Sequence, residues 1–297
     1  MEFKFMKATT LAVGTLVMMS CSNDVVEYLP SGNPDTTIVR AQLAAYESQS
    51  QALAGENDIT DMKAFLFQGG TMTKIYDLGA DAQQGYSIQV DSRQGNLYLV
   101  AYAGGTIPTD DLLAKNLTEE NWKSSVIHME GEHAQFFTGM VTLESTSIPS
   151  NTATVSLKRG LARFDLAVNA VEEASVKSVT LKNVAHSAYV FPQEGVTSPV
   201  EADRKDMTVT FTEPVTDSKE GILYVYEQEN QNIQISVTAV ISGNETTLTK
   251  TFDGPLKRNT AYTITLRQDY IDIKLETSFD EWEEGGNTEL TPDDKTE

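Results

Sequence analysis

The sequence predicts an all-β protein made of two β-sandwiches in series. Short runs rich in aromatic and β-branched residues recur along the chain, at spacings of roughly 8–15 residues. Clusters of Gly, Asn and Asp separate these runs, as in the turns of antiparallel sheets. No long amphipathic helix pattern interrupts the series. The chain of 297 residues is long enough for two domains of ordinary size.

The first series of predicted strands opens with a hairpin. KAFLFQ (63–68) is followed by a Gly-Gly turn and then by TMTKIYDL (71–78). GYSIQV (85–90) leads through a polar turn to LYLVAYA (97–103), which is typical of a central strand that is buried on both faces. Residues 108–125 are the one helical candidate, and we expect an insertion with one or two helical turns there.

The second series begins with TVSLKRGLARFDLAV (154–168), where Gly160 separates two apolar stretches and indicates a bulge or bend. Further apolar runs follow at 176–184, 207–212, 222–227, 233–241, 245–252 and 261–276. The predicted organisation is a signal peptide (1–20), a tether or propeptide with one removable strand (21–40), an N-terminal sandwich (41–150), a C-terminal sandwich (151–282) and an acidic tail (283–297).

The N-terminus has the pattern of a secretory signal peptide. Two lysines precede an apolar run at 8–19, which is shorter than the roughly 20 residues that span a bilayer. Cys21, the only cysteine, follows directly and has no disulfide partner. The segment resembles a bacterial lipobox, which implies lipidation of Cys21 and anchoring in the outer membrane, with the polar stretch after it resembling a surface-export signal. The alternative is an ordinary signal peptide with a chance cysteine.

Composition narrows the function classes. The formal net charge of −21 argues against nucleic acid or an anionic membrane surface as a partner. The chain carries no nucleophile motif and no phosphate-binding glycine loop, so we predict neither an enzyme nor a cofactor. A loop with His128 and His133 allows a weak metal site, but a solvated loop is favoured. A hydrolase with two facing carboxylates is a further alternative.

Exposed aromatic side chains are the usual means by which proteins bind sugars. Tyr76, Tyr86, Trp122 and Trp282 are candidates in this sequence. Packing in the core or at strand ends explains them more simply, except for Trp122, which we take as a ligand contact. A surface glycan-binding lipoprotein beside an outer-membrane nutrient transporter is therefore the alternative function.

Several segments together resemble the fimbrillin superfamily of Bacteroidetes, the subunits and anchors of the type V pilus. They are the lipoprotein signal ending at Cys21, the hairpin MKAFLFQGGTMTKIYDL, the strand YLVAYAGG, the pair FFTGMVTLES and VSLKRGLARFDLAV, and LKRNTAYTITL followed by Trp282. The likeness covers most of the chain after Cys21. It implies two transthyretin-like Greek-key sandwiches, no enzymatic activity, an adhesive role and a place in the fimbrium at the cell surface.

The resemblance also implies assembly by strand exchange between fimbrial subunits. An arginine-specific protease removes the N-terminal strand, and a strand from a neighbour fills the groove. TTIVRAQLAAY (36–46) fits such a site, with cleavage between Arg40 and Ala41. The alternative is a surface arginine in the first strand. The donated strand could lie in QDYIDIKLE (268–276), or the protein could be a tip, or an anchor that keeps its lipid.

Overall fold

The structure is a computed structural model, and it describes most of the chain between residues 36 and 275. The described ranges are 36–48, 50–59, 61–78, 86–103, 112–113, 115–128, 135–144, 152–169, 173–199, 204–229, 231–267 and 271–275. Cys21, the predicted signal peptide, His133, Trp282 and the predicted acidic tail lie outside these ranges. In the described part, no helix is long and apolar enough to cross a membrane.

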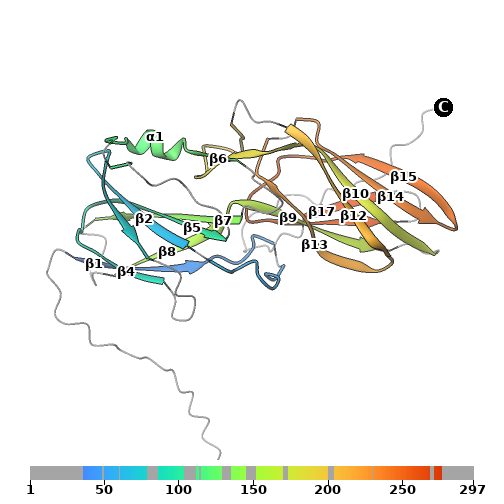
Figure 1. Cartoon of the computed structure of the whole chain (residues 1–297), viewed down its shortest axis with the longest axis horizontal. Coiled ribbons are helices and arrows are strands. Elements are labelled where there is room, and N and C mark those ends of the chain that lie inside the picture. Colours follow the sequence, from blue (N-terminus) through green and yellow to red (C-terminus); the bar gives the residue numbers. More distant parts are fainter. Residues whose placement is uncertain are drawn as a thin grey trace, which may run out of the picture. The chain divides into compact units, whose positions relative to one another are not determined.

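The described elements are strands with one short helix, and the predicted all-β class is confirmed (Figure 1). The first eight strands are β1 (Thr37–Leu43), β2 (Asp61–Gln68), β3 (Thr71–Asp77), β4 (Tyr86–Val90), β5 (Gly95–Ala103), β6 (Val126–His128), β7 (Gln135–Leu143) and β8 (Thr152–Arg159). The others are β9 (Leu161–Val168), β10 (Ala174–Ala185), β11 (Ser187–Tyr189), β12 (Arg204–Val215), β13 (Ser218–Tyr226), β14 (Gln234–Ile241), β15 (Asn244–Thr251), β16 (Ala261–Leu266) and β17 (Ile271–Leu275).

The first sandwich is one seven-stranded sheet with the order β3-β2-β5-β7-β8-β1-β4. Only two residue pairs join β7 to β8, whereas β8 pairs with β1 over six. One core takes side chains from both arms of the sheet, among them Val39 and Val155 on one side and Leu66 and Leu99 on the other. The sheet therefore folds over on itself at β8, and its two arms enclose the core.

Strand β5 is buried on both faces, as the sequence predicts for 97–103. Leu97 and Leu99 point into the core of the first sandwich, while Tyr98 and Val100 join a second apolar cluster on the opposite face. The helix α1 (Glu119–Lys123) and the segment after β11 cover this opposite face. In Figure 1 the helix lies along β2 and β5 on the side away from β1 and β4.

The second sandwich pairs two four-stranded sheets, β12-β10-β14-β15 and β13-β9-β16-β17. Its core contains aliphatic side chains of β10 and β14 opposite an aromatic group of Phe164, Phe252 and Tyr262. The alternating burial along β14 places Ile235, Val237 and Ala239 in this core. A period of two in the side chains is what a strand with one buried face requires.

Gly160 is the point where the chain passes from the first sandwich to the second. The sequence treats 154–168 as a strand that opens the second sandwich, and this part of the prediction is wrong. Strand β8 pairs with β1 in the first sandwich, and β9 pairs with β13 and β16 in the second. The predicted bend at Gly160 is confirmed, because the chain bends there between the two strands. The domain limits at residue 150 stay a prediction.

Gly160 has no room for a side chain. A Cβ at this position would lie 2.0 Å from Cζ of Phe136, whose ring is buried. Gly160→Ala is expected to lower the free energy of unfolding by about 1–3 kcal/mol, because the ring cannot move away without disturbing its neighbours. Urea unfolding followed by circular dichroism measures this loss. The same change in a Phe136→Leu background should cost less, and an equal cost would contradict the steric explanation.

Candidate functional site

Strand β1 lies inside a sheet although it stands near the N-terminus. It pairs in parallel with β8 and antiparallel with β4, which is the edge strand of that arm. Its side chains alternate: Thr37, Val39 and Ala41 are buried, whereas Arg40 is exposed. Val39 and Ala41 belong to the core of the first sandwich. Strand β1 thus occupies the place between β8 and β4 and contributes two side chains to the core.

The two neighbours of β1 hold different parts of it. Strand β4 pairs with Thr37–Ala41 only, whereas β8 pairs with residues 38 to 43. A cut after Arg40 would therefore release nearly every residue that pairs with β4, while Ala41, Gln42 and Leu43 would keep their pairing with β8. The Arg40 side chain is exposed, but its main chain is paired on both sides, with Ser87 and Thr154. Cleavage requires β1 to leave the sheet locally.

The chain after β1 forms a segment that we call the strap (residues 44–57), which runs between the sandwiches. The main-chain nitrogen of Ala44 donates to the oxygen of Leu157 at 2.8 Å, on the side of the first sandwich. On the side of the second, the nitrogen of Glu47 donates to the oxygen of Asn259 at 2.9 Å. Asn259 Nδ2 donates in return to the oxygen of Ala45 at 2.8 Å. The strap is thus hydrogen-bonded to both sandwiches.

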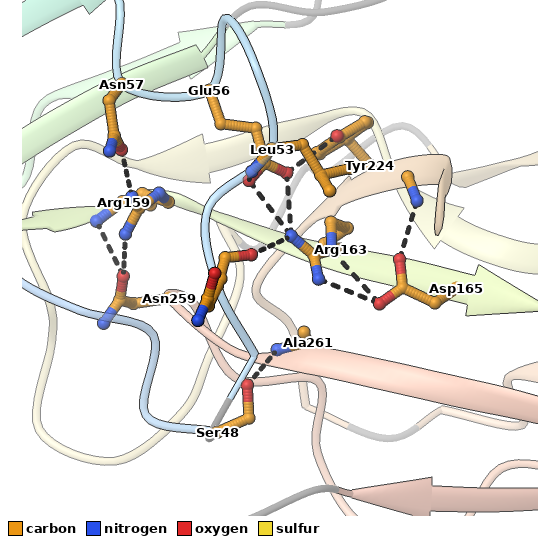
Figure 2. Close-up of polar contacts among 12 residues, drawn as sticks. Ser48, Leu53, Glu56, Asn57, Arg159, Arg163, Asp165, Tyr224, Asn259 and Ala261 are labelled. Carbon is orange, nitrogen blue, oxygen red and sulfur yellow. Dashed lines mark hydrogen bonds and ion pairs between the residues drawn. The ribbon is translucent and has the colours of Figure 1, made fainter. Parts of the chain in front are cut away.

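Arg163 of β9 is the centre of the polar contacts under the strap (Figure 2). One terminal nitrogen lies 3.0 Å from a carboxylate oxygen of Glu56 and donates to the oxygen of Gln51 at 2.9 Å. The other donates to Asp165 at 2.9 Å. The side chains of Arg163 and Glu56 are 1% and 3% exposed, so this is a buried ion pair. Tyr224 adds a hydrogen bond to Glu56 at 2.7 Å.

Arg159, at the end of β8, holds the strap from the first sandwich. Its Nη1 donates to the oxygen of Ala44 at 2.9 Å and to Oδ1 of Asn259 at 3.1 Å, and its Nη2 donates to Asn57. Figure 2 shows Arg159 and Arg163 side by side beneath the strap. The ring of Tyr46 lies over both guanidinium groups, at 4.2 Å and 4.9 Å from its centroid. The aromatic face lowers the cost of placing two cations close together.

Arg163 and Tyr224 of this network both have a pKa above the ordinary value. Burial by itself lowers the pKa of Arg163, but Asp165 and Glu56 raise it more, so that the net pKa lies above its ordinary value. Burial, together with the hydrogen bond to Glu56, raises the pKa of Tyr224. Tyr224 therefore stays protonated and donates, while Arg163 stays charged. The network can therefore fix the strap.

The predicted site residues fall in different places. Arg40 and Ala41 lie in β1, and Cys21 lies outside the described residues. Processing between Arg40 and Ala41 stays a prediction. His128 is exposed in β6. Among the described residues, no group of three or more His, Cys, Asp or Glu side chains could hold a metal ion.

The expectation that Trp122 is exposed is wrong. Its side chain is 1% exposed and lies against Phe65, Phe67 and Phe191, with ring centroids 4.3, 6.3 and 5.5 Å away. The sequence placed Trp122 in a loop insertion, but Thr118 caps a helical turn that points the indole into the second apolar cluster. A side chain buried in this way cannot stack on a sugar, so this reason for a glycan site is lost.

The strap network is the part of the site that sequence reasoning missed. Glu56 is more than a hundred residues from both Arg159 and Arg163 in the chain, and no local pattern connects it to them. One signal was present. Two arginines lie on either side of Gly160 in the stretch LKRGLARFDL, which also contains Lys158 and Asp165, and charged residues in a buried strand need a partner.

Comparisons with known proteins agree with the observed architecture. The family model of a bacterial Ig-like domain matches residues 188–281, which begin within β11 and contain β12 to β17. No curated protein sequence is significantly similar to the chain. Among solved structures, the tip fimbrial protein Mfa3 from Porphyromonas gingivalis superimposes with a TM-score of 0.56 at 13% identity, over 80% of this chain and 98% of that one.

A fimbrial assembly protein from Parabacteroides distasonis superimposes with a TM-score of 0.54 at 16% identity, over 82% of this chain and 95% of that one. This chain has the fold of these fimbrial proteins. A protein from the same species that is provisionally assigned to cell adhesion shares it too, with a TM-score of 0.54 at 17% identity over 80% and 89% of the two chains. The superposition on Mfa3 includes parts of both sandwiches, because it covers 80% of this chain, which is more than either sandwich alone.

Proposed function

We propose that the protein is a non-enzymatic structural subunit of a cell-surface fimbrium, that it assembles by strand exchange, and that it serves adhesion. The position of β1 carries this proposal. The part of β1 before the cut lies between two other strands and places Val39 in the core, so its removal leaves a groove that another strand can fill. The fold shared with fimbrial proteins adds support, since it extends over 98% of the C-terminally truncated Mfa3 chain and 95% of the fimbrial assembly protein chain.

Cleavage between Arg40 and Ala41 would vacate the place of residues 37–40 in the sheet and leave β4 with only its pairing to Ala41, while the strap stays in place. The released part holds Thr37 and Val39 in the sheet and has no contact in the strap network. The strap begins four residues beyond Arg40 and keeps its bonds to both sandwiches. A cut subunit would therefore present an open site between β8 and β4, and a strand from a neighbouring subunit could fill it and restore the pairing of β4.

Export as a lipoprotein completes the proposal. Lipid on Cys21 would hold the precursor at the outer membrane, and removal of residues 21–40 by an arginine-specific protease would release it. A tip or stalk subunit undergoes this step, whereas an anchor keeps its lipid. Strand β17 already pairs with β16 in the second sandwich. If this strand is the one donated, it must first leave the sheet.

The N-terminal residue and intact mass of the protein from the native cell surface test the proposal. We expect a chain that begins at Ala41 and carries no lipid. The Arg40→Ala variant should remain uncut while Arg267→Ala, a control in the second sandwich, is processed normally. A surface protein that starts at lipidated Cys21 would mean an anchor instead. Normal processing of Arg40→Ala would refute the cleavage site.

A further inference from the structure

The outer face of the sheet β12-β10-β14-β15 carries an ordered array of hydroxyl groups. The inward residues of these strands, such as Val179, Val237 and Leu248, pack in the core of the second sandwich. Serine or threonine occurs on every strand at positions between them: those on β12 and β15 are exposed, Ser178, Thr180 and Thr238 are half-buried, and Ser236 is buried. Strand pairing aligns them into two rows of four, Thr210-Ser178-Thr238-Thr247 and Thr208-Thr180-Ser236-Thr249.

Hydrogen bonds link the hydroxyl groups across neighbouring strands. Thr180 pairs with Thr208 at 2.8 Å, Ser236 with Thr249 at 2.8 Å, and Thr238 with Thr247 at 3.1 Å. A hydroxyl group has one donor and two acceptor sites, so each linked pair keeps one donor and several acceptors for another partner. The members on the outer strands β12 and β15 are exposed. These bonds fix the orientation of the array in advance of binding.

No charged residue stands in either row, which is unusual in this chain. Lys and Arg number 22 and Asp and Glu number 43 among 297 residues, yet all eight positions are neutral. Charges occur only at the borders of the array, where Lys177 is paired with Glu245. The face is thus a neutral, hydroxyl-rich patch on a protein of net charge −21.

We propose that this face, the hydroxyl array, binds a neutral polysaccharide. The net charge of the protein repels anionic polymers, and a cationic partner would prefer the acidic surface elsewhere. With strands about 4.8 Å apart and outward residues about 6.8 Å apart, the array covers roughly 300 Å², well below the roughly 800 Å² per partner of a stable protein complex. A second copy of the chain is therefore a poor occupant.

A sugar polymer matches the array in chemistry. Each threonine presents a methyl group beside its hydroxyl, and a sugar ring likewise presents C–H groups beside hydroxyls that both donate and accept. A small patch of neutral hydrogen bonds gives weak binding, since each bond replaces one to water. Many copies along a fimbrium would turn this into firm attachment. That last step rests on the proposed function, whereas binding by the single chain does not.

Affinity electrophoresis of the purified full chain tests the inference, in native gels that contain dextran, galactomannan or soluble starch. We expect at least one of these polymers to retard the protein. A quadruple valine variant removes four hydroxyl groups but keeps the shape and the strand propensity of the side chains. It carries Thr180→Val, Thr208→Val, Thr238→Val and Thr247→Val. Its apparent Kd should rise at least fivefold. The control Thr73→Val with Thr142→Val, exposed in the first sandwich, should change it less than twofold.

Two further variants keep the test decisive. Serine at the same four positions should retain binding, because the hydroxyl groups remain. If the valine variant does not fold, Thr247→Lys places a charge over the array from its exposed edge and should abolish retardation. The inference is overturned if no neutral polymer retards the protein, if an alginate gel alone does so, or if the valine variant binds as well as the unmodified chain. Neither lipidation nor processing at Arg40 enters these measurements, so failure here leaves the fimbrial proposal standing.

Discussion

Replacing Arg163 by methionine is expected to lower the free energy of unfolding by about 3–5 kcal/mol, because it leaves Glu56 and Asp165 without their buried cation. Urea unfolding at pH 7 measures the loss. Glu56 belongs to the strap, so amide hydrogen exchange in residues 50–57 should speed up as well. The double variant Arg163→Met with Glu56→Gln should recover part of the stability, since it removes one of the two uncompensated carboxylates.

Lys177→Met is the matched control for this prediction. Lys177 and Glu245 also form an ion pair, but their side chains are 44% and 59% exposed. Such a pair contributes only about 0–1 kcal/mol. Equal losses in Arg163→Met and Lys177→Met would mean that burial adds nothing to the strap network.

Trp122→Ala is the second change with a large expected effect, a loss of about 3–5 kcal/mol in the free energy of unfolding. The indole fills the apolar cluster between α1 and the sheet, against Phe65 and Phe191. Its removal leaves a cavity that the surrounding strands can close only in part. Urea unfolding, with tryptophan-independent detection by circular dichroism, measures the loss.

Two controls separate packing from ligand contact. Trp122→Phe should retain most of the stability, and Leu113→Ala, at a side chain that is 43% exposed, should change it little. A stable Trp122→Ala protein that has lost binding to a polysaccharide would restore the sugar-contact interpretation that the buried position contradicts.

Local patterns were enough to predict most of the strands. The spacing of apolar and turn residues predicts the hairpin of β2 and β3, the doubly buried β5 and the bend at Gly160. This spacing depends only on residues that are close in the sequence. The short helix α1 is harder to predict from local patterns than the strands. A helix of five residues gives little periodic signal. The face that it covers depends on its packing against β5, which local patterns do not give.

Assignment of strands to sheets could not be predicted from such patterns. The chain passes from one sandwich to the other at Gly160, although the apolar pattern is nearly continuous through 154–168. Each of these strands pairs with a segment that is distant in the sequence: β8 pairs with β1, and β9 pairs with β16. The two serine and threonine rows depend on registers between four strands in the same way, so no single strand reveals them.

The all-β class, the excess of acidic residues and an arginine in a strand near the N-terminus can be predicted from the sequence alone, because they depend on composition and on contacts within a few residues. The position of β1 between β8 and β4, the bonds of the strap to Arg159 and Arg163 and the burial of Trp122 are visible only in the folded chain. Burial and charge pairing arise between residues far apart in the chain, and only the folded chain brings them together.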